Sequence, residues 1–409
     1  MPKLAQFSLL ASGWLCAIMP AFSDRERNAR YEDGGIGGPD RGGGGRDDCP
    51  SHDAFPPPDL PPLLPEASRT THGRLLTMMK KVKTEEESPL ERFFSAVQQF
   101  LTQPPLIIWG SGATVPCGLP TMKDLALHIK NTVVPDLDAD KSFEEELGDD
   151  KYDDVLNQIR QEIWNKVSEA DMAIPAKILK GDDEHLNAIG YLIKTIYESH
   201  PQVVNFVTTN YDRVVEYVAA KNGFSVTDGT GMAALSNFDI ATFGDEKMVN
   251  VVKVHGSLSW FSDGSEVRSS YVKLPGQNPV IIIPGKRKYH DVMQVPYREL
   301  IQKTDDLISE AGAVLVVGFG FNDEHLTPKL VKRANRGIPI VVVTKMVTLE
   351  CKHELERAGK MLMVEENPGK PDSSLITYRN LPTCDTVSYA VEGKYWKLNK
   401  FMEALYENR

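Results

Sequence analysis

The sequence predicts a mixed α/β protein built on a parallel sheet with helices on both faces. Four short segments are apolar almost throughout, namely 105–109 (PLIIW), 203–207 (VVNFV), 313–321 (AVLVVGFGF) and 338–344 (IPIVVVT). Such runs are typical of strands that are buried on both faces of a sheet. The segments between them repeat apolar residues three and four positions apart, which is helical spacing. Strands that alternate with helices in this way favour a parallel sheet.

The elements follow in order from about Leu90. Helices are expected over 90–101 and 123–134, on either side of the first strand. Residues 138–199 are rich in charge and in helical spacing, so we expect a helical insertion between the first and second core strands. A less regular stretch follows the second strand and its helix, up to about residue 247. The remaining expected elements are strands over 249–255, 279–284, 313–321 and 338–344, and a long helix over 294–311.

The two ends of the chain differ from the central segment, 90–345. Within residues 1–78, positions 34–45 contain eight glycines and 50–65 contain seven prolines, a composition typical of disorder. The apolar stretch before residue 23 fits a secretory signal peptide. Alternatively, the segment is a spurious extension and translation starts at Met78 or Met79. Residues 346–409 are expected to form a strand and helix extension for packing or oligomerisation, ending in an amphipathic helix over 395–407.

Composition and charge argue against several classes of function. The 409 residues are 41% hydrophobic, which suffices for an ordinary packed core. A net charge of −11 argues against direct nucleic-acid binding. No stretch reaches the ~20 apolar residues that a membrane-spanning helix needs. The five cysteines are scattered without a Cys-x-x-Cys pair, which excludes the usual zinc-ribbon spacing and argues against a disulfide framework. We therefore expect a cytoplasmic protein without a metal.

Four loops that follow predicted strands carry the residues suited to chemistry, at the sheet edge where open α/β sheets bind ligands. Two of these loops are rich in glycine and would let the backbone approach a pyrophosphate beside a helix N-terminus. Similar turns also occur without a ligand, and the third glycine of a dinucleotide-binding turn is missing. The candidate residues of these two loops are Gly110, Ser111, Gly112, Ala113 and Thr114, and Gly318, Phe319, Gly320 and Asn322.

The other two loops carry polar side chains. Thr209, Asn210 and Asp212 follow the strand 203–207, and His255 ends the strand 249–255. Asn210 could instead cap a helix, and a lone histidine is more often structural. An amide, a carboxylate and an imidazole at one sheet edge nevertheless form the arrangement that proton transfer needs. Asp323 and His325 lie beside the fourth loop, but their tetrapeptide Asp-Glu-His-Leu also occurs at 183–186 and carries little weight.

The order of these loops resembles the sirtuin-like NAD⁺ hydrolases of bacterial antiphage defence. The residues that carry the resemblance are GSGAT (110–114) with GLPT (118–121), TTNYD (208–212), HGSL (255–258) and GFGFND (318–323), and IIPGKRKY (282–289) adds a less specific element. The family includes the sirtuin partner of the HerA ATPase and the Thoeris NAD-cleaving effector. The resemblance runs from about residue 95 to 345 and implies a sirtuin-like, Rossmann-type catalytic domain over 90–345, without the zinc module of protein deacetylases.

Residue roles follow from the resemblance. The two glycine loops would hold the pyrophosphate and adenosine half of NAD⁺. Asn210 matches the asparagine that orients the nicotinamide ribose and the attacking water, Asp212 lies where sirtuins hold the carboxamide, and His255 matches the catalytic histidine. Ser111 replaces the usual alanine of this loop, which leaves the phosphate geometry open.

The resemblance implies an NAD⁺ hydrolase that acts as a defence effector by depleting NAD⁺, with NAD⁺ as substrate and no metal. Nicotinamide is a cationic leaving group, and the transition state resembles that of other glycosyl hydrolyses. Two alternatives stay open: a non-catalytic subunit that senses NAD or ADP-ribose in a larger assembly, and an NAD-dependent deacylase or ADP-ribosyltransferase. A homo-oligomer is expected, and the resemblance adds a HerA-type ATPase as a partner.

Overall fold

The structure is a computed structural model that describes residues 89–138, 141–148, 150–231, 235–264, 266–285, 295–381 and 384–406. The predictions for residues 1–78, and for 286–289 of the segment IIPGKRKY, lie outside the described residues.

A nine-stranded sheet forms the centre of the described chain, in the order β13-β12-β11-β10-β9-β1-β2-β5-β3. Neighbouring strands from β11 to β3 pair in parallel, whereas β12 and β13 are antiparallel. The sheet strands are β1 (Leu106–Trp109), β2 (Val203–Thr208), β3 (Val226–Thr227), β5 (Met248–Lys253), β9 (Val314–Val317), β10 (Ile340–Val343), β11 (Lys360–Glu366), β12 (Ser373–Asn380) and β13 (Cys384–Glu392).

The register brings the carboxyl ends of the central strands to one edge. Trp109 at the end of β1 pairs with Thr208 of β2 and with Val317 of β9. Thr208 in turn pairs with Lys253, the last residue of β5. The loops that follow β1, β2, β5 and β9 therefore begin side by side.

Alternate side chains of the buried strands belong to two different apolar clusters, each of which includes helices. Ile107 and Trp109 belong to the apolar cluster that includes helices α3, α8, α9 and α14, whereas Leu106 and Ile108 belong to the cluster of α11, α12 and α13. The bounds are α3 (Pro89–Phe100), α9 (Val214–Lys221), α11 (Tyr297–Glu310), α12 (Thr327–Asn335), α13 (Leu349–Leu355) and α14 (Leu398–Tyr406). The prediction of a parallel sheet covered on both faces is confirmed.

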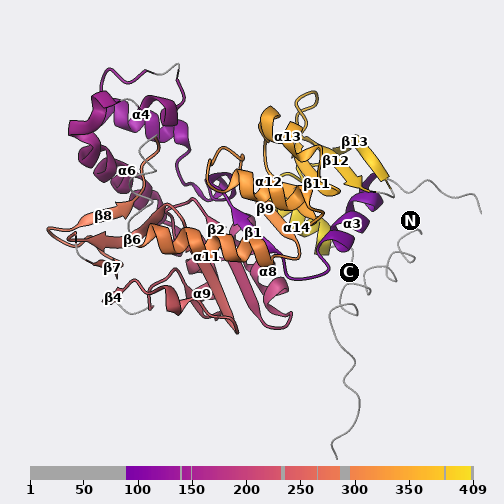
Figure 1. Ribbon diagram of the computed structural model, residues 1–409, viewed down its shortest axis with the longest axis horizontal. Coiled ribbons are helices and arrows are strands. Elements are labelled where there is room, and N and C mark those ends of the chain that lie inside the picture. Colours follow the sequence, from indigo (N-terminus) through magenta and orange to yellow (C-terminus); the bar gives the residue numbers. More distant parts are fainter. Residues whose placement is uncertain are drawn as a thin grey trace, which may run out of the picture. The chain divides into compact units, whose positions relative to one another are not determined.

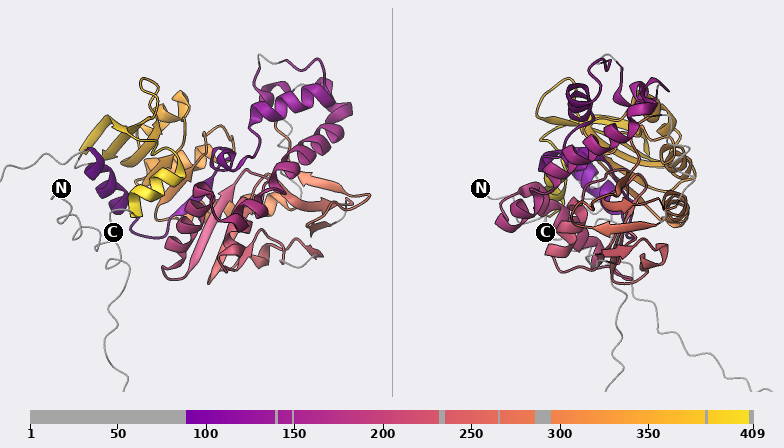
Figure 2. Two further views of the ribbon diagram at one scale, coloured as in Figure 1. Left: turned by 180° about the vertical axis from the view of Figure 1, so that it is seen from behind. Right: turned by 90° about the vertical axis from the view of Figure 1, so that its left-hand side faces the viewer.

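A helical segment separates β1 from β2, as the sequence indicated. It contains the 3-10 helices η2 (Ser111–Ala113), η3 (Val115–Cys117) and η4 (Asp150–Val155), and the helices α4 (Met122–Thr132), α5 (Phe143–Glu146), α6 (Leu156–Asp171), α7 (Ile174–Lys180) and α8 (Glu184–Tyr197). Helix α8 packs on β2, α9 and α14, so it covers the sheet as a crossover helix. Helices α4, α5 and α6 pack on one another and lie far from β11–β13 (Figure 1 and Figure 2).

A second, antiparallel sheet was not predicted. It has the order β4-β7-β6-β8, with β4 (Leu235–Asn237), β6 (Gly256–Ser262), β7 (Val267–Ser270) and β8 (Asn278–Ile281), and the 3-10 helix η5 (Ile240–Thr242) follows β4. The apolar run 279–284 therefore contributes to this sheet and not to the parallel one, which corrects the expectation. Gly256 makes the change of sheet possible: its φ is +90°, and a Cβ there would lie 2.1 Å from the carbonyl oxygen of Val280.

The C-terminal residues extend the same fold. Strand β11 continues the parallel sheet, and β12 and β13 return antiparallel at its edge. Phe401 and Met402 of α14 are buried and pack in the same cluster as Phe93 of α3. None of the helices in the described part of the chain is long and apolar enough to span a membrane.

Candidate active site

A cavity of about 280 Å³ lies at the carboxyl ends of β1, β2, β5 and β9. All four loops singled out in the sequence contribute to its lining. Its sheet side is lined by Ser111, Thr114, Thr209, Asn210, Tyr211, Asp212, His255, Gly318, Phe319, Gly320, Asn322 and Asp323. The helical segment supplies mainly apolar residues to the lining, together with the polar Ser142 and the acidic Glu144; the apolar ones are Leu119, Pro120, Met122, Leu125, Phe143 and Val167. The predicted loops are thus brought together in one pocket.

The two glycine loops pack directly against each other. The N–H of Gly112 donates to the carbonyl oxygen of Gly318 over 2.9 Å. A Cβ on Gly110 would lie 2.4 Å from that oxygen, and one on Gly318 would lie 2.0 Å from the nitrogen of Ala113. Three glycines are therefore required for the contact between the loops. Gly110, Gly112 and Ala113 do not line the cavity, although they were predicted to contact the ligand.

The first glycine loop offers few free N–H groups. The N–H groups of Gly110, Gly112, Ala113 and Thr114 all donate to main-chain carbonyls within the protein. The loop also leads into two 3-10 turns, and α4 begins only at Met122, where Thr121 closes a capping box with Asp124. The sequence had suggested that this loop presents a helix N-terminus to the cavity. The structure shows that it does not. Ser111 and Thr114 of the first glycine loop still line the cavity, and so do the residues of the second glycine loop.

Asn210, in the loop after β2, forms hydrogen bonds with the first glycine loop. Its side-chain Nδ2 donates to the carbonyl oxygen of Gly110 over 3.1 Å and to Thr114 Oγ1 over 3.3 Å. Both bonds use the amide nitrogen, so the side-chain oxygen can accept a hydrogen bond from water or substrate. Helix α9 begins at Val214, four residues later, and its N-cap position is Arg213. The alternative that Asn210 caps this helix is therefore not what the structure shows.

Asp212 is a buried carboxylate beside Asn210. Its Oδ2 accepts a hydrogen bond from Thr114 Oγ1 over 3.1 Å, and its Oδ1 accepts one from the N–H of Val214 over 3.3 Å. Burial raises the pKa of Asp212, while the positive charge of Lys253 and the two hydrogen bonds oppose this rise. Thr114 thus contacts both polar residues of the second loop, which fixes their relative position.

His255 lies in the turn between β5 and β6 and faces a carboxylate. Its Nε2 lies 3.0 Å from Asp323 Oδ2, which is an ion-pair distance although the approach is not that of a hydrogen bond. Both side chains are largely buried and line the cavity. A carboxylate beside a histidine can orient the ring. Asp323 is therefore a site residue that the sequence analysis left out of its candidate set.

The repeated tetrapeptide Asp-Glu-His-Leu explains why Asp323 was overlooked. Asp183 and Asp323 form the same local structure, in which Oδ1 accepts the N–H groups two and three residues later over 2.9 to 3.0 Å. This is a turn that aspartate favours in any context. In the second copy the other oxygen lies at ion-pair distance from a histidine ring, a contact between positions 255 and 323 that no local pattern reveals.

The first copy of the tetrapeptide also contributes to the site. His185 Nε2 lies 2.6 Å from the carbonyl oxygen of Ala113, in a buried contact behind the first glycine loop. Burial lowers the pKa of His185, which favours the neutral ring. The residue therefore supports the loop from α8 and does not face the cavity.

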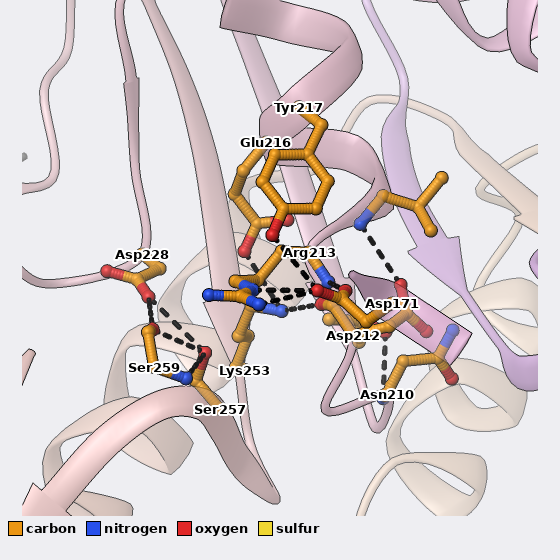
Figure 3. A network of polar contacts seen from close by, with 12 residues as sticks. Asp171, Asn210, Asp212, Arg213, Glu216, Tyr217, Asp228, Lys253, Ser257 and Ser259 are labelled. Atoms are coloured by element: carbon orange, nitrogen blue, oxygen red, sulfur yellow. Dashed lines mark hydrogen bonds and ion pairs between the residues drawn. The ribbon is translucent and has the colours of Figure 1, made fainter. Parts of the chain in front are cut away.

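A network of buried ion pairs lies behind the second loop (Figure 3). Asp171 at the end of α6 accepts the N–H of Arg213 over 2.7 Å and its guanidinium over 2.9 and 2.7 Å. Lys253 at the end of β5 lies 2.9 Å from Glu216 of α9 and donates to the carbonyl oxygen of Asp212. None of these four side chains was among the sequence candidates, because each pair joins positions that are far apart in the chain.

Further along the same edge, Asp228 accepts hydrogen bonds from three side chains of β6. They are Ser257 (3.5 Å), Ser259 (3.2 Å) and Trp260 (3.0 Å), which donate to its Oδ2. These bonds join the end of β3 to the second sheet, so that the turn carrying His255 is anchored on the side away from the cavity. The described residues contain no cluster of three or more histidine, cysteine or acidic side chains that could hold a metal ion.

Residues 204–357 match the family model of the SIR2-like domain. The match includes three of the four loops and extends from β2 to the end of α13. The loop 110–114 lies before it.

Several solved structures of Sir2 proteins are similar to the chain. One, described as showing the structural basis for the mechanism and regulation of Sir2 enzymes, has 12% sequence identity and a TM-score of 0.40, and the similarity covers 78% of this chain and 98% of that one. Sir2Tm bound to a propionylated peptide has 14% identity and a TM-score of 0.37, with 64% and 89% covered. A complex of a Sir2 homologue with NAD has 12% identity and a TM-score of 0.35, with 59% and 78% covered. No curated protein matches the chain.

Proposed function

We propose that the protein is an NAD⁺ hydrolase that cleaves the bond between nicotinamide and ribose. The observation that carries the proposal is the meeting of Asn210, Asp212 and His255 in one cavity, with Asp323 behind the histidine. The match of residues 204–357 to the SIR2-like domain supports NAD⁺ as the ligand, together with the resemblance of the four loops to sirtuin-like NAD⁺ hydrolases.

The cavity suits the chemistry of this bond. The C1′–N bond breaks and the electron pair leaves with nicotinamide, so positive charge develops on the ribose. Asp212 and Asp323 provide negative charge at the cavity wall, which stabilises such a transition state. A water oxygen then bonds to C1′ and loses its proton to the His255–Asp323 pair or to solvent, giving ADP-ribose. Asn210 would orient the water or the ribose through its free amide oxygen.

The mainly apolar wall from the helical segment gives this reaction a dry side. Leu119, Leu125 and Phe143 line the same cavity as the polar loops, although Ser142 and Glu144 of this segment also line it. Exclusion of bulk water strengthens the electrostatic contribution of the carboxylates. Nicotinamide, a flat aromatic group with one amide, fits between such a wall and the polar residues Asn210 and Asp212.

One assay separates hydrolysis from the alternatives. The protein is incubated with NAD⁺ alone and then with NAD⁺ and an acylated peptide, and nicotinamide and ADP-ribose are followed by chromatography. Release of both products from NAD⁺ alone supports the proposal. Nicotinamide release that requires the peptide indicates a deacylase, and binding of NAD⁺ without any product indicates a sensing subunit.

The proposal extends to a biological role through the family resemblance. An enzyme that depletes NAD⁺ fits an effector of antiphage defence, held inactive until it is triggered. The control would come from homo-oligomerisation and a HerA-type ATPase partner. Co-purification of the chain with such an ATPase, followed by the same assay, tests this part separately from the chemistry.

A further inference from the structure

Lys253 is an almost fully buried lysine immediately behind the candidate site, with 1% of its side chain exposed. Its ammonium lies 2.9 Å from Glu216 Oε1 and donates a hydrogen bond to the main-chain carbonyl oxygen of Asp212. Burying an ammonium costs several kcal/mol even when it is paired, and an apolar residue of similar volume is often at least as stable. Stability alone therefore gives no strong reason for a lysine at this position.

The turn from Asn210 to Arg213 is held at three places. Thr114 donates to the Asp212 carboxylate on the cavity side. Asp171 fixes Arg213 through its main chain and its guanidinium. Lys253 holds the carbonyl oxygen of Asp212 from the sheet. Of the three, Lys253 is the one that brings a positive charge to Asp212 itself, and it does not line the cavity.

We propose that Lys253 is a positioning residue for Asp212, which fixes the turn through the main-chain carbonyl and keeps the Asp212 carboxylate in its charged form facing the cavity. The inference rests on the proposed function, because it assumes that Asp212 contacts NAD⁺. Glu216 then serves as the second partner of the buried ammonium and limits how much positive charge reaches Asp212.

The surrounding charges set the direction of the effect. The charged and titratable groups that interact with Asp212 are Lys253 on β5, Asp171 on α6 and Cys117 before α4. Burial and Asp171 raise the pKa of Asp212, and Lys253 lowers it. Burial also raises the pKa of Glu216 to about 7, against the opposing effect of Lys253. Because the pKa of Asp212 is raised, its charged form is complete at high pH and is lost as the pH falls.

Lys253 lowers the pKa of Asp212, and its acidic partner Glu216 counteracts this effect. Substitutions of the two residues should therefore affect the pH dependence of NAD⁺ binding differently. Lys253→Met removes the charge that opposes the rise, so the loss of NAD⁺ binding on the acidic side should move to higher pH. Glu216→Gln leaves the lysine without its acidic partner. Because the pKa of Glu216 is about 7, the same loss should move to lower pH if it occurs above pH 7, and should stay in place if it occurs below. A role in folding alone would change stability without moving the two profiles.

The experiment measures kcat and KM for NAD⁺ between pH 5 and 9, and the Kd of NAD⁺ by calorimetry over the same range. For Lys253→Met we expect KM and Kd to rise about 10-fold on the acidic side of the profile and to recover at high pH, because below its pKa the charged fraction of a carboxyl falls about tenfold for each pH unit by which that pKa rises. Lys352→Met is the matched control, since Lys352 pairs with the buried Glu365 over 2.9 Å between α13 and β11, outside the cavity lining.

The inference is overturned if Lys253→Met loses NAD⁺ binding at the same acidic pH as the wild type. It is also overturned if the variant binds NAD⁺ more weakly by the same factor at every pH. If Lys253→Met does not fold, Glu216→Gln decides: a loss of binding that moves to higher pH contradicts the inference, and so does a loss above pH 7 that stays in place. Failure of the proposed function shows differently. A wild-type protein that binds NAD⁺ without hydrolysing it refutes the hydrolase, and the calorimetric profile still judges Lys253. A wild-type protein that binds no NAD⁺ refutes both.

Discussion

The pairing of His255 with Asp323 decides which histidine of the chain is suited to catalysis. His185 and His255 are both buried, but His185 contacts a main-chain carbonyl whereas His255 faces a carboxylate in the cavity. A ring that can be stabilised in its protonated form can accept a proton during the reaction. The side-chain partner, more than burial, therefore distinguishes the two roles.

Removing Asn210 or His255 should abolish most NAD⁺ cleavage. Asn210→Ala and His255→Ala are each expected to lower kcat by about 100-fold or more, the usual loss for a group that moves a proton or orients the nucleophile. Asn210→Ala also removes two buried hydrogen bonds, so its melting temperature should fall as well, and turnover is compared at a temperature where both variants are folded. His353→Ala, on the exposed side of α13, is the control. Near-wild-type turnover of either site variant would show that the site is assigned wrongly.

Asp323→Asn tests the carboxylate without removing the turn. An asparagine keeps the oxygen that accepts the N–H groups of His325 and Leu326, and loses only the charge facing His255. We expect kcat to fall by about 10-fold or more while KM changes less, because the effect is on the protonated ring and not on substrate binding. The repeated tetrapeptide supplies the control: Asp183→Asn makes the same change in the first copy. Equal effects of the two variants on kcat would contradict this role for Asp323.

At the level of loops and strands, the sequence was informative where a pattern is local. The apolar runs predicted the central strands, and their carboxyl ends predicted where Asn210 and His255 would meet, because parallel strands end at one edge. The second sheet was missed because β6 and β8 pair across the chain, and the run 279–284 has the same apolar composition as a core strand. Composition does not say which sheet a short strand joins.

The glycine loops show a second limit of local patterns. Gly110 and Gly318 were interpreted as ligand contacts, yet their missing side chains allow the two loops to touch. The ion pairs of Asp171 with Arg213 and of Lys253 with Glu216 escaped prediction for a related reason. Each pair is defined by the packing of α6 or β5 against α9, and nothing in the separate segments indicates the partner.

Gly110→Ala should therefore destabilise the protein before it affects ligand contacts. The new Cβ would lie 2.4 Å from the carbonyl oxygen of Gly318, and both groups are main chain or directly attached to it. Overpacking of this kind typically costs about 1–3 kcal/mol of the free energy of unfolding. Denaturant unfolding measures the loss, with Gly359→Ala as control, since a Cβ at Gly359 would meet nothing within 4 Å. A stability equal to that of the wild type would show that the loops can separate without cost.

In the described chain, the C-terminal strands β11–β13 and the helices α4–α6 lie at opposite ends (Figure 2). The last helix was expected to provide a face for oligomerisation, but Leu398, Phe401 and Met402 of α14 are already buried within the chain. Their apolar surface is used for packing on α3 and α8. The assembly face predicted from the sequence is therefore reduced to the helical segment.

An NAD⁺ hydrolase that is always active would deplete its own cell, so the proposed function requires a means of control. Homo-oligomers are the usual assemblies of such chains, and we predict a multimer larger than a dimer. The helical segment exposes Met172, Leu179 and Tyr191, so charged substitutions of these residues should lower the measured mass, whereas Leu381→Lys near the end of β12 should not. Light scattering before and after substitution measures this. A wild-type monomer with full NAD⁺ turnover would contradict assembly as the control, whereas a monomer that turns over NAD⁺ only with an added ATPase would leave control by a partner in place.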